Sequence, residues 1–461
     1  MIQTIRNAWA VPELRKKIMF TIFALLIFRL GAAIPVPYIN SELLKLQLEA
    51  QSGTILGLMN AMSGSAFSLA TVFALSIQPY INSSIIIQLL TVAIPYLERL
   101  AKEGGEEGRK KIASITRYTT VAIALIQGCG YYSLIKSYGL IQGGSLPAFW
   151  VGLVIVLSFT AGSAFLMWLG EQITEFGIGN GISVILFAGI VSRFPQMIID
   201  AVNGISIWNQ VKAGTLTAEM LVEANPLVYK TAEDAQNYLD QVALAPWMIP
   251  VIIVGVLAMV VFIVFISNAE RRIPVQYAKR VVGRKMYGGQ STHIPMKLNM
   301  SGVMPIIFAQ SIASLPATIG AFMGWTTDNS AMMRVFDTSK PFYCILYFVL
   351  IVGFSYFYSS MQFNPVEVSN NLKKNGGFIP GFRPGKPTGD FIAKVLNKIT
   401  MFGALYLSVV AIAPIITGNI FGYQSLAIGG TSVIIVVGVA LETVKQMEAQ
   451  MLMRHYKGFL E

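Results

Sequence analysis

The residues that could do chemistry inside the apolar part of this chain are amides and hydroxyls. The stretch SIQPYINSSIIIQLL (76–90) carries no charge. At 3.6 residues per turn, one helical arc of about 120° there holds both amides and isoleucines: Gln78, Ile81, Asn82, Ile85 and Gln88. Membrane helices use such amides to hydrogen-bond their neighbours, which is one interpretation. The same arc also suits a pore wall with an apolar constriction, and the pattern alone leaves both interpretations open.

A second stretch of this kind is NMSGVMPIIFAQSIASLPATIG (299–320). It places Gln310 and Ser311 between Pro305 and Pro316. Prolines remove backbone hydrogen bonds, so a helix of this kind bends or flexes readily. Two polar helices of this type in an apolar chain indicate a gate.

Ionisable groups suited to catalysis are scarce. The sequence has two histidines, His293 and His455, both outside the apolar segments, and it has no HExxH motif, Cys/His cluster or P-loop. An intramembrane protease is therefore disfavoured. No carboxylate lies near the middle of an apolar segment, which disfavours a carrier driven by protons or cations. The sequence predicts no catalytic residue, no metal, no cofactor and no enzymatic activity.

The elements that hold these residues are membrane helices. Hydrophobic residues make up 54% of the 461 residues and charged residues 12%, and the mean hydropathy is +0.61. Soluble domains are about one quarter charged. We therefore predict an all-α polytopic membrane protein with ten transmembrane helices. The predicted spans are 18–35, 74–95, 112–135, 147–169, 181–204, 247–267, 301–324, 341–363, 396–416 and 426–444.

The lysines and arginines orient these spans. Ten spans place both termini on one side, and 26 of the 34 Lys and Arg residues then fall on that side, which the positive-inside rule assigns to the cytoplasm. Two crossings within the charge-free run 50–97 would invert every later loop. We therefore predict that GLMNAMSGSAFSLATVF (57–73) is a half-length helix that enters the membrane without crossing it. Such a segment implies an internal cavity.

The chain divides into two halves of five spans each. Residues 1–204 hold the first half, the polar segment 205–246 connects the halves outside the membrane, and residues 247–461 hold the second half. An odd number of spans per half predicts that the two halves are inverted relative to each other. The long cytoplasmic loops 268–299 and 364–398 both belong to the second half.

These two loops are strongly basic. They contain ERRIPVQYAKRVVGRK and NLKKNGGFIPGFRPGKPTG. The lysine and arginine side chains of these loops can bind anionic lipid, or they can bind an acidic partner such as ribosomal RNA. Arg383 stands among glycines and prolines, which favours a shaped contact. The candidate docking residues are Arg271, Arg272, Lys279, Arg280, Arg284 and Arg383.

Seven stretches, in order along nearly the whole chain, carry a family resemblance. They are RLGAAIPVP, FALSIQPYINSSIIIQLL, EGRKKIASITRYTT, GIGNGIS, NMSGVMPIIFA, GFIPGFRPGKPT and GTSVIIVV. Together they resemble the SecY family, the channel subunit of the protein translocase, and the tail MRHYKGFL is similar to bacterial members. Two departures are YIN at 38–40, where Gly-Ile-Asp is frequent, and Leu186, where isoleucine is common.

The resemblance implies an hourglass channel with a hydrophobic ring, a plug and a lateral gate to the lipid. The ring would be formed by Ile81, Ile85, Ile182, Leu186, Ile307 and Ile435. The plug would be a half-helix at about 60–72 that includes Asn60, Met62, Ser63, Gly64, Ser65 and Phe67. At the gate the second and third spans would face the seventh and eighth, with Gln88, Gln127, Gln310 and Ser311 as polar members.

The resemblance also implies a passive pore that is driven from outside the chain. Its function would be to translocate secretory proteins across the bacterial plasma membrane and to release membrane proteins laterally into it. The expected partners are the small subunits SecE and SecG, the SecA motor ATPase, the ribosome, signal peptides and nascent chains, and anionic lipids. A five-plus-five secondary transporter for a small solute is the alternative from another class, disfavoured by the missing carboxylates and the large basic loops.

Overall fold

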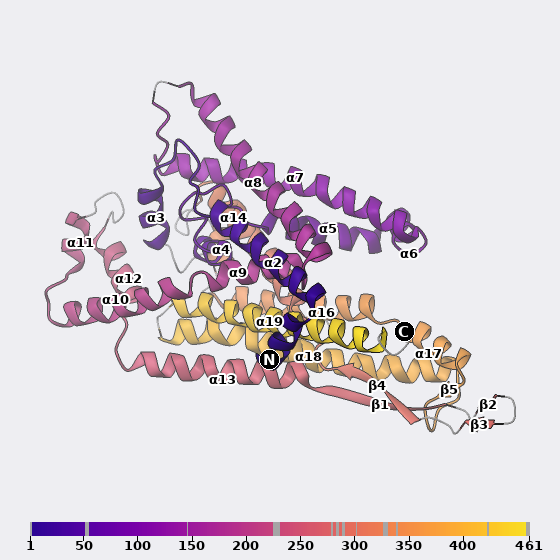
Figure 1. Ribbon diagram of the computed structural model, residues 1–461. Helices are drawn as coiled ribbons and strands as arrows, with labels where there is room; N and C mark the ends of the chain where they lie inside the picture. The colour runs from indigo at the N-terminus through magenta and orange to yellow at the C-terminus, as the bar shows by residue number, and fades with distance from the viewer. Residues whose placement is uncertain are drawn as a thin grey trace.

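Figure 1 shows a computed structural model of the chain. It describes residues 2–457 except 51–54, 145, 225–230, 278–279, 283–284, 288–290, 301, 326–330, 338–339 and 422–423. Two predicted docking residues, Lys279 and Arg284, lie outside the described residues.

All ten segments predicted to span a membrane are helical. Their helices are α2 (Pro12–Gly31), α5 (Gln78–Ala93), α7 (Gly105–Ser137), α8 (Ala148–Phe176), α9 (Gly181–Val191) followed by α10 (Phe194–Lys212), α13 (Met248–Asn268), α14 (Met304–Phe322), α16 (Pro341–Gln362), α18 (Lys386–Phe421) and α19 (Gln424–Lys457). Among the described residues, six helices are long and apolar enough to cross a membrane, or seven if α5 and α6 (Pro95–Lys102), bent by 103°, count as one span. The prediction of an all-α polytopic membrane protein is confirmed for this bundle.

The two halves of the chain lie against each other along the bundle. In Figure 1, α5, α7 and α8 lie in the upper part and α13, α18 and α19 in the lower part. The halves meet where α14 packs on α5 and α7, and where α9 packs on α19. The short helices α3 (Ser41–Ala50), α11 (Ala218–Ala224) and α12 (Ala232–Val242) gather at one end, and the strands lie at the opposite end. The polar parts of the chain therefore collect at two ends of an apolar bundle.

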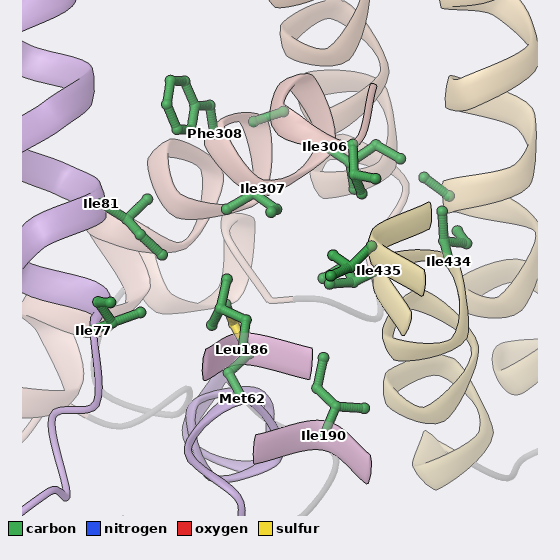
Figure 2. Packing of buried hydrophobic residues seen from close by; sticks show 14 of the residues in the cluster. Met62, Ile77, Ile81, Leu186, Ile190, Ile306, Ile307, Phe308, Ile434 and Ile435 are labelled. Atoms are coloured by element: carbon green, nitrogen blue, oxygen red, sulfur yellow. The ribbon is translucent and has the colours of Figure 1, made fainter. Parts of the chain in front are cut away.

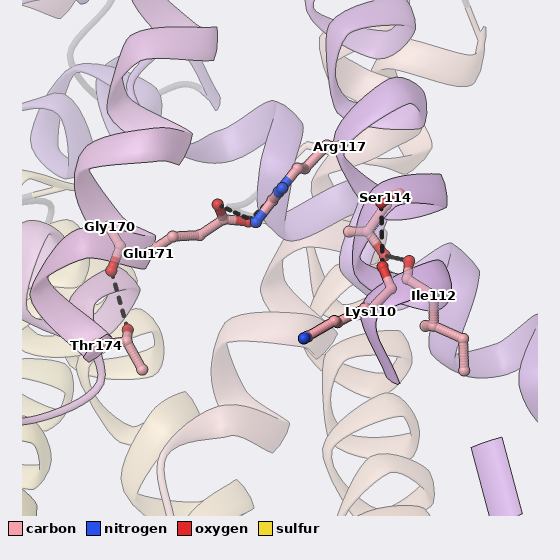
Figure 3. Close-up of polar contacts among 8 residues, drawn as sticks. Lys110, Ile112, Ser114, Arg117, Gly170, Glu171 and Thr174 are labelled. Carbon is pink, nitrogen blue, oxygen red and sulfur yellow. Dashed lines mark hydrogen bonds and ion pairs between the residues drawn. The ribbon is translucent and has the colours of Figure 1, made fainter. Parts of the chain in front are cut away.

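Polar contacts fasten three helices of the first half to one another. Arg117 of α7 and Glu171 of α8 form a two-point ion pair, with Nε 3.0 Å from Oε1 and Nη2 2.9 Å from Oε2 (Figure 3). The Ser83 hydroxyl of α5 donates to the Thr116 carbonyl of α7 at 2.8 Å. Paired guanidinium–carboxylate bonds fix orientation as well as distance. Helices α5, α7 and α8 therefore form one unit.

The two basic loops fold together as a β-structured unit beside the helical bundle, with strands that the sequence did not predict. Strand β1 (Glu270–Tyr277) pairs antiparallel with β4 (Ser291–Lys297) of the same loop and with β5 (Gly377–Phe378) of the other loop. Strands β2 (Arg280–Val282) and β3 (Lys285–Tyr287) form a hairpin. Ile273 and Val275 alternate with exposed residues along β1, and they pack in one cluster with Ile379 and Ile392. This alternation is the signal of a half-buried strand.

The half-helix near the start of the second span is displaced from its predicted position. It was expected at about 60–72, but helix α4 runs from Ile55 to Ser63 and turns follow it to position 77. Asn60 Oδ1 accepts the Ser68 N–H at 3.0 Å, and Ser63 Oγ accepts the Phe67 N–H at 3.0 Å. These side chains occupy N–H groups that a longer helix would have used, so the helix ends early.

The fifth predicted span is interrupted. Helix α9 is 11 residues long and ends at Val191, and α10 begins anew with Pro195 in its first turn. Proline cannot donate the backbone hydrogen bond that would continue the earlier helix. Helix α9 packs on α4.

Candidate channel, plug and gate

Helices from both halves bring apolar side chains to a common centre. Figure 2 shows one such residue from each of four helices: Ile81 of α5, Leu186 of α9, Ile307 of α14 and Ile435 of α19. Each of them is at most 2% exposed, as is Ile85. Ile182 is partly buried and packs against the same cluster. The structure thus brings all six predicted ring residues to one cluster.

The sequence analysis missed further members of this centre. Ile77, Ile190, Ile306 and Ile434 belong to the same buried cluster (Figure 2). They lie one to four positions from predicted ring residues. Isoleucine and leucine side chains occupy several neighbouring positions in these stretches, so only the packing identifies which of them join the centre.

Of the predicted plug residues, Met62 belongs to this centre, and Phe67 belongs to a second buried cluster with Tyr131. Met62 of α4 is buried and points toward Leu186 (Figure 2). After α4, the buried Phe67 stacks on Tyr131 of α7 with ring centroids 4.4 Å apart, and the Tyr131 hydroxyl donates to the Phe67 carbonyl. Farther along, Ala70 accepts a backbone hydrogen bond from Val36 at 2.9 Å. The segment is therefore held by α7 and by the chain that follows α2.

Two glycines allow this segment to touch α9 through backbone atoms. Gly64 has φ +68°, and a Cβ placed on it would lie 2.8 Å from the Gly189 carbonyl oxygen. A Cβ on Gly189 would lie 2.8 Å from the Met62 carbonyl oxygen. Both distances are shorter than real side chains tolerate, so glycine is required at both positions.

Hydrogen bonds cross the seam between the two halves, where α5 and α7 face α14 and α16. Gln78 Nε2 of α5 donates to Ser311 Oγ of α14 at 3.0 Å. The Tyr358 hydroxyl of α16 donates to Gln88 Oε1 of α5 at 2.8 Å. The sequence analysis placed Gln88 and Ser311 at a gate. Gln78 and Tyr358 were not predicted at the gate. Tyr358 lies in an apolar span with several other aromatic residues, so its type and spacing do not mark it as a hydrogen-bonding residue.

Other buried amides along these helices are incompletely satisfied. The side-chain oxygens of Asn82, Gln127 and Gln310, on α5, α7 and α14, have no hydrogen-bond partner within the described part of the chain. A buried acceptor without a partner costs about 1–3 kcal/mol. The amides of α5 therefore serve as links between helices at Gln78 and Gln88, while its isoleucines line the centre. The helix-linking interpretation of the stretch 76–90 applies at Gln78 and Gln88, and a pore wall at its isoleucines stays a prediction.

The described candidate docking residues lie on the β-structured unit. Arg271, Arg272 and Arg383 are exposed, and Arg272 Nε lies 2.7 Å from Glu270 Oε1. Around Arg383 the chain is shaped by Gly381 (φ +88°) and Gly385 (φ +103°), and the Arg383 carbonyl accepts a hydrogen bond from Thr388 at 2.7 Å. The strand pairing of β1 with β4 and β5 brings parts of both basic loops together, and we call this region the basic platform (residues 270–277, 291–297 and 377–388).

This arrangement defines a class of protein: a polytopic helical membrane protein whose two halves meet at a buried apolar centre beside a polar seam. Comparison with known proteins supports this class. The SecY family model matches residues 71–444. The protein translocase subunit SecY of Streptomyces coelicolor is 43% identical over 477 residues, covering 100% of both chains.

Two solved structures have the same fold at low identity. One is a SecY protein studied for the way its plug domain stabilises the closed state of the translocation channel and maintains a membrane seal (TM-score 0.61, 16% identity, 95% of this chain and 92% of that one). The other is Sec61 in the canine ribosome–channel complex of the endoplasmic reticulum (TM-score 0.58, 16% identity, the same coverage). The chain belongs to the SecY family, and it is a protein translocase subunit and a multi-pass membrane protein.

Proposed function

We propose that the six ring residues form the constriction through which a polypeptide passes and that α4 with the turns after it is the plug that closes it. The observation that carries this proposal is the convergence of Ile81, Leu186, Ile307 and Ile435, from both halves, on one buried apolar centre that Met62 covers (Figure 2). A narrow apolar constriction excludes hydrated ions by dewetting. Isoleucine and leucine side chains can still yield to a peptide, because their contacts are non-directional.

The seam is the proposed lateral gate. The bonds Gln78–Ser311 and Gln88–Tyr358 join the first half to the second and would break when the halves separate. The ion pair Arg117–Glu171 lies within the first half and would remain intact. A hydrophobic segment of a signal peptide or a nascent membrane protein would leave the channel between α5 and α14.

The basic platform is the proposed docking surface for the SecA motor ATPase and for the ribosome. The fold of ribosome-bound Sec61 supports the second partner, and the exposed arginines supply the phosphate contacts that RNA requires. Two further small subunits, SecE and SecG, would cover apolar helix faces such as that of α13, where Val254, Val261 and Phe265 are exposed. Anionic lipids would surround the same end of the bundle.

We place the protein in the bacterial plasma membrane, with both termini cytoplasmic and the connecting segment 205–246 outside. The opposite placement of the basic platform and of α11 and α12 supports this orientation (Figure 1). The chain would have no enzymatic activity of its own, and energy would come from the partner ATPase or from translation.

Photocrosslinking tests the ring. A photoreactive amino acid at Ile85 or Ile307 is expected to crosslink to a secretory precursor that is stalled in transit. The same probe at Val254, on the exposed face of α13, is the control and should not crosslink. A stalled precursor that crosslinks at neither ring position would exclude this centre as the pore.

Charge reversal tests the platform. Arg383→Glu is expected to slow export severely, since a shaped arginine contact becomes repulsive to phosphate, while the protein remains folded and inserted. Lys340→Glu, an exposed charge at the start of α16, is the matched control. Normal export by the Arg383 variant would leave the platform with a lipid-facing role only.

A further inference from the structure

Arg29, in the last turn of α2, contacts the plug directly. Its Nη1 donates to the Gly64 carbonyl oxygen and to the Ser192 hydroxyl, each at 3.2 Å. The Ser192 hydroxyl in turn donates to the Gly189 carbonyl oxygen at 2.7 Å. One guanidinium nitrogen thus joins α2, the end of the plug helix and the end of α9.

Three helices end around this side chain. Helix α2 ends at Gly31, α4 ends at Ser63 and α9 ends at Val191. The last carbonyl groups of a helix have no partner within the helix, and they carry partial negative charge. The Arg29 cation therefore meets the Gly64 carbonyl oxygen directly and reaches the Gly189 carbonyl oxygen through the Ser192 hydroxyl. An apolar residue in the same position would leave those carbonyls without a charged donor.

The cost of keeping a charge here is limited by its exposure. The Arg29 side chain is exposed in the isolated chain, so its remaining N–H donors can be hydrated. The plug contact that it reinforces includes backbone atoms, at Gly64 and Gly189, beside the buried packing of Met62. Charge-assisted hydrogen bonds are stronger than neutral ones, so the bond to Gly64 and the bond to Ser192 add to the packing that holds the plug against α9.

We propose that Arg29 is a positioning residue that latches the plug in the closed position. This inference rests on the proposed role of α4 as the plug. Helix α9 packs both on α2 and on α19 of the second half. Separation of the halves would pull α9 away from α2 through its contact with α19, and Ser192 would then move relative to Arg29. Opening of the channel would therefore weaken the latch before the plug leaves.

Thiol labelling of the assembled translocase in membrane vesicles tests the latch. Cys129 and Cys344 are first replaced by serine, and Ala61→Cys reports on the plug because Ala61 is buried in α4. Arg29→Gln is expected to raise the rate of labelling by a water-soluble maleimide about 10-fold to 100-fold, the equivalent of one hydrogen bond to a charged group. Arg29→Lys, which keeps the charge, should label at close to the parent rate.

Three controls separate a latch from a general structural effect. Ala124→Cys, buried on α7, should label no faster in the Arg29→Gln background. Lys136→Gln removes an exposed charge from the last turn of α7 and should leave the plug unaffected. If Arg29→Gln does not assemble, Ser192→Ala removes one acceptor only, and it is expected to raise labelling of the plug about 2-fold to 10-fold.

Three results would contradict the latch. The first is an unchanged labelling rate at Ala61→Cys in the variant tested, and the second is an equal rise in the labelling rates at Ala61→Cys and Ala124→Cys. The third is a labelling rate in Arg29→Lys as high as that in Arg29→Gln. Ion conductance of the resting channel, measured in parallel, tests the plug itself. Faster plug labelling without conductance would support the latch while refuting the seal. Faster labelling with conductance supports both.

Discussion

The same helix, α5, contributes to the apolar centre and to the polar seam. At the centre, Ile81 and Ile85 belong to one buried cluster with isoleucines and leucines from several other helices, α9, α14 and α19 among them. At the seam, Gln78 and Gln88 each make one hydrogen bond to the opposite half. The two regions are therefore joined by different forces on neighbouring turns of one helix.

The difference between apolar packing at the centre and hydrogen bonds at the seam explains how the channel could open toward the lipid and still be sealed at rest. Burial of an isoleucine side chain is worth about 1.5–3 kcal/mol, whereas a hydrogen bond between membrane helices is worth about 0.6–2 kcal/mol. The buried amides without partners, such as Gln127, weaken the seam further. We expect the seam to yield first and the centre to yield only to a polypeptide.

The largest effect is expected from a charge in the centre. Ile307→Asp buries a carboxylate without a partner, and we expect a loss of about 3 kcal/mol or more in stability, together with ion leakage through the resting channel. Thermal unfolding in detergent and single-channel conductance measure the two effects. Ile307→Leu, which conserves volume, should cost less than about 1.5 kcal/mol. An ion-tight Ile307→Asp channel would contradict the assignment of this centre as the seal.

A smaller but still large effect is expected where the plug touches α9. Gly189→Ala places a Cβ 2.8 Å from the Met62 carbonyl oxygen, so backbone must move, at a cost of about 1–3 kcal/mol. Lower thermal stability and greater exposure of the plug should both be measurable. Gly255→Ala is the matched control, because its Cβ meets nothing within 4 Å on α13, and it should stabilise that helix by up to about 1 kcal/mol.

At the seam, loss of one hydrogen bond should favour opening. Tyr358→Phe removes the donor to Gln88 and is expected to cost the closed gate about 0.5–1.5 kcal/mol. Precursors with weakly hydrophobic signal sequences should then be exported several-fold faster. A double-mutant cycle with Gln88→Leu measures the coupling, and strictly additive effects of the two substitutions would show that the bond does not hold the gate.

The smallest effect should have the opposite sign. Gln127→Leu replaces a buried amide whose oxygen has no partner in the described residues, so it is expected to stabilise the closed seam by about 1 kcal/mol. Thermal stability should rise, and export of precursors with weak signal sequences should slow. Gln142→Leu, at an exposed position, is the control. Faster export in the Gln127 variant would mean that this amide supports the closed state.

Most of the membrane architecture and the faces of its central helices could be predicted from the sequence. Ile81, Asn82 and Ile85 are buried as their spacing on α5 indicates, because period 3.6 and the absence of charge apply within a single helix. The place of the half-helix was predicted less well. Its bounds depend on hydrogen bonds from Asn60 and Ser63 to later residues, which propensity does not report.

The sequence by itself determined the class, the ten helical segments and the set of residues that could line a channel, since composition, charge and motifs are local properties. The tertiary structure alone decided which of these residues meet. It paired Gln88 with Tyr358, 270 positions away, joined β1 to β5 across two loops, and placed Arg29 at the ends of three helices. Such contacts depend on how distant segments pack, and a pattern read along one segment carries no information about its distant partner.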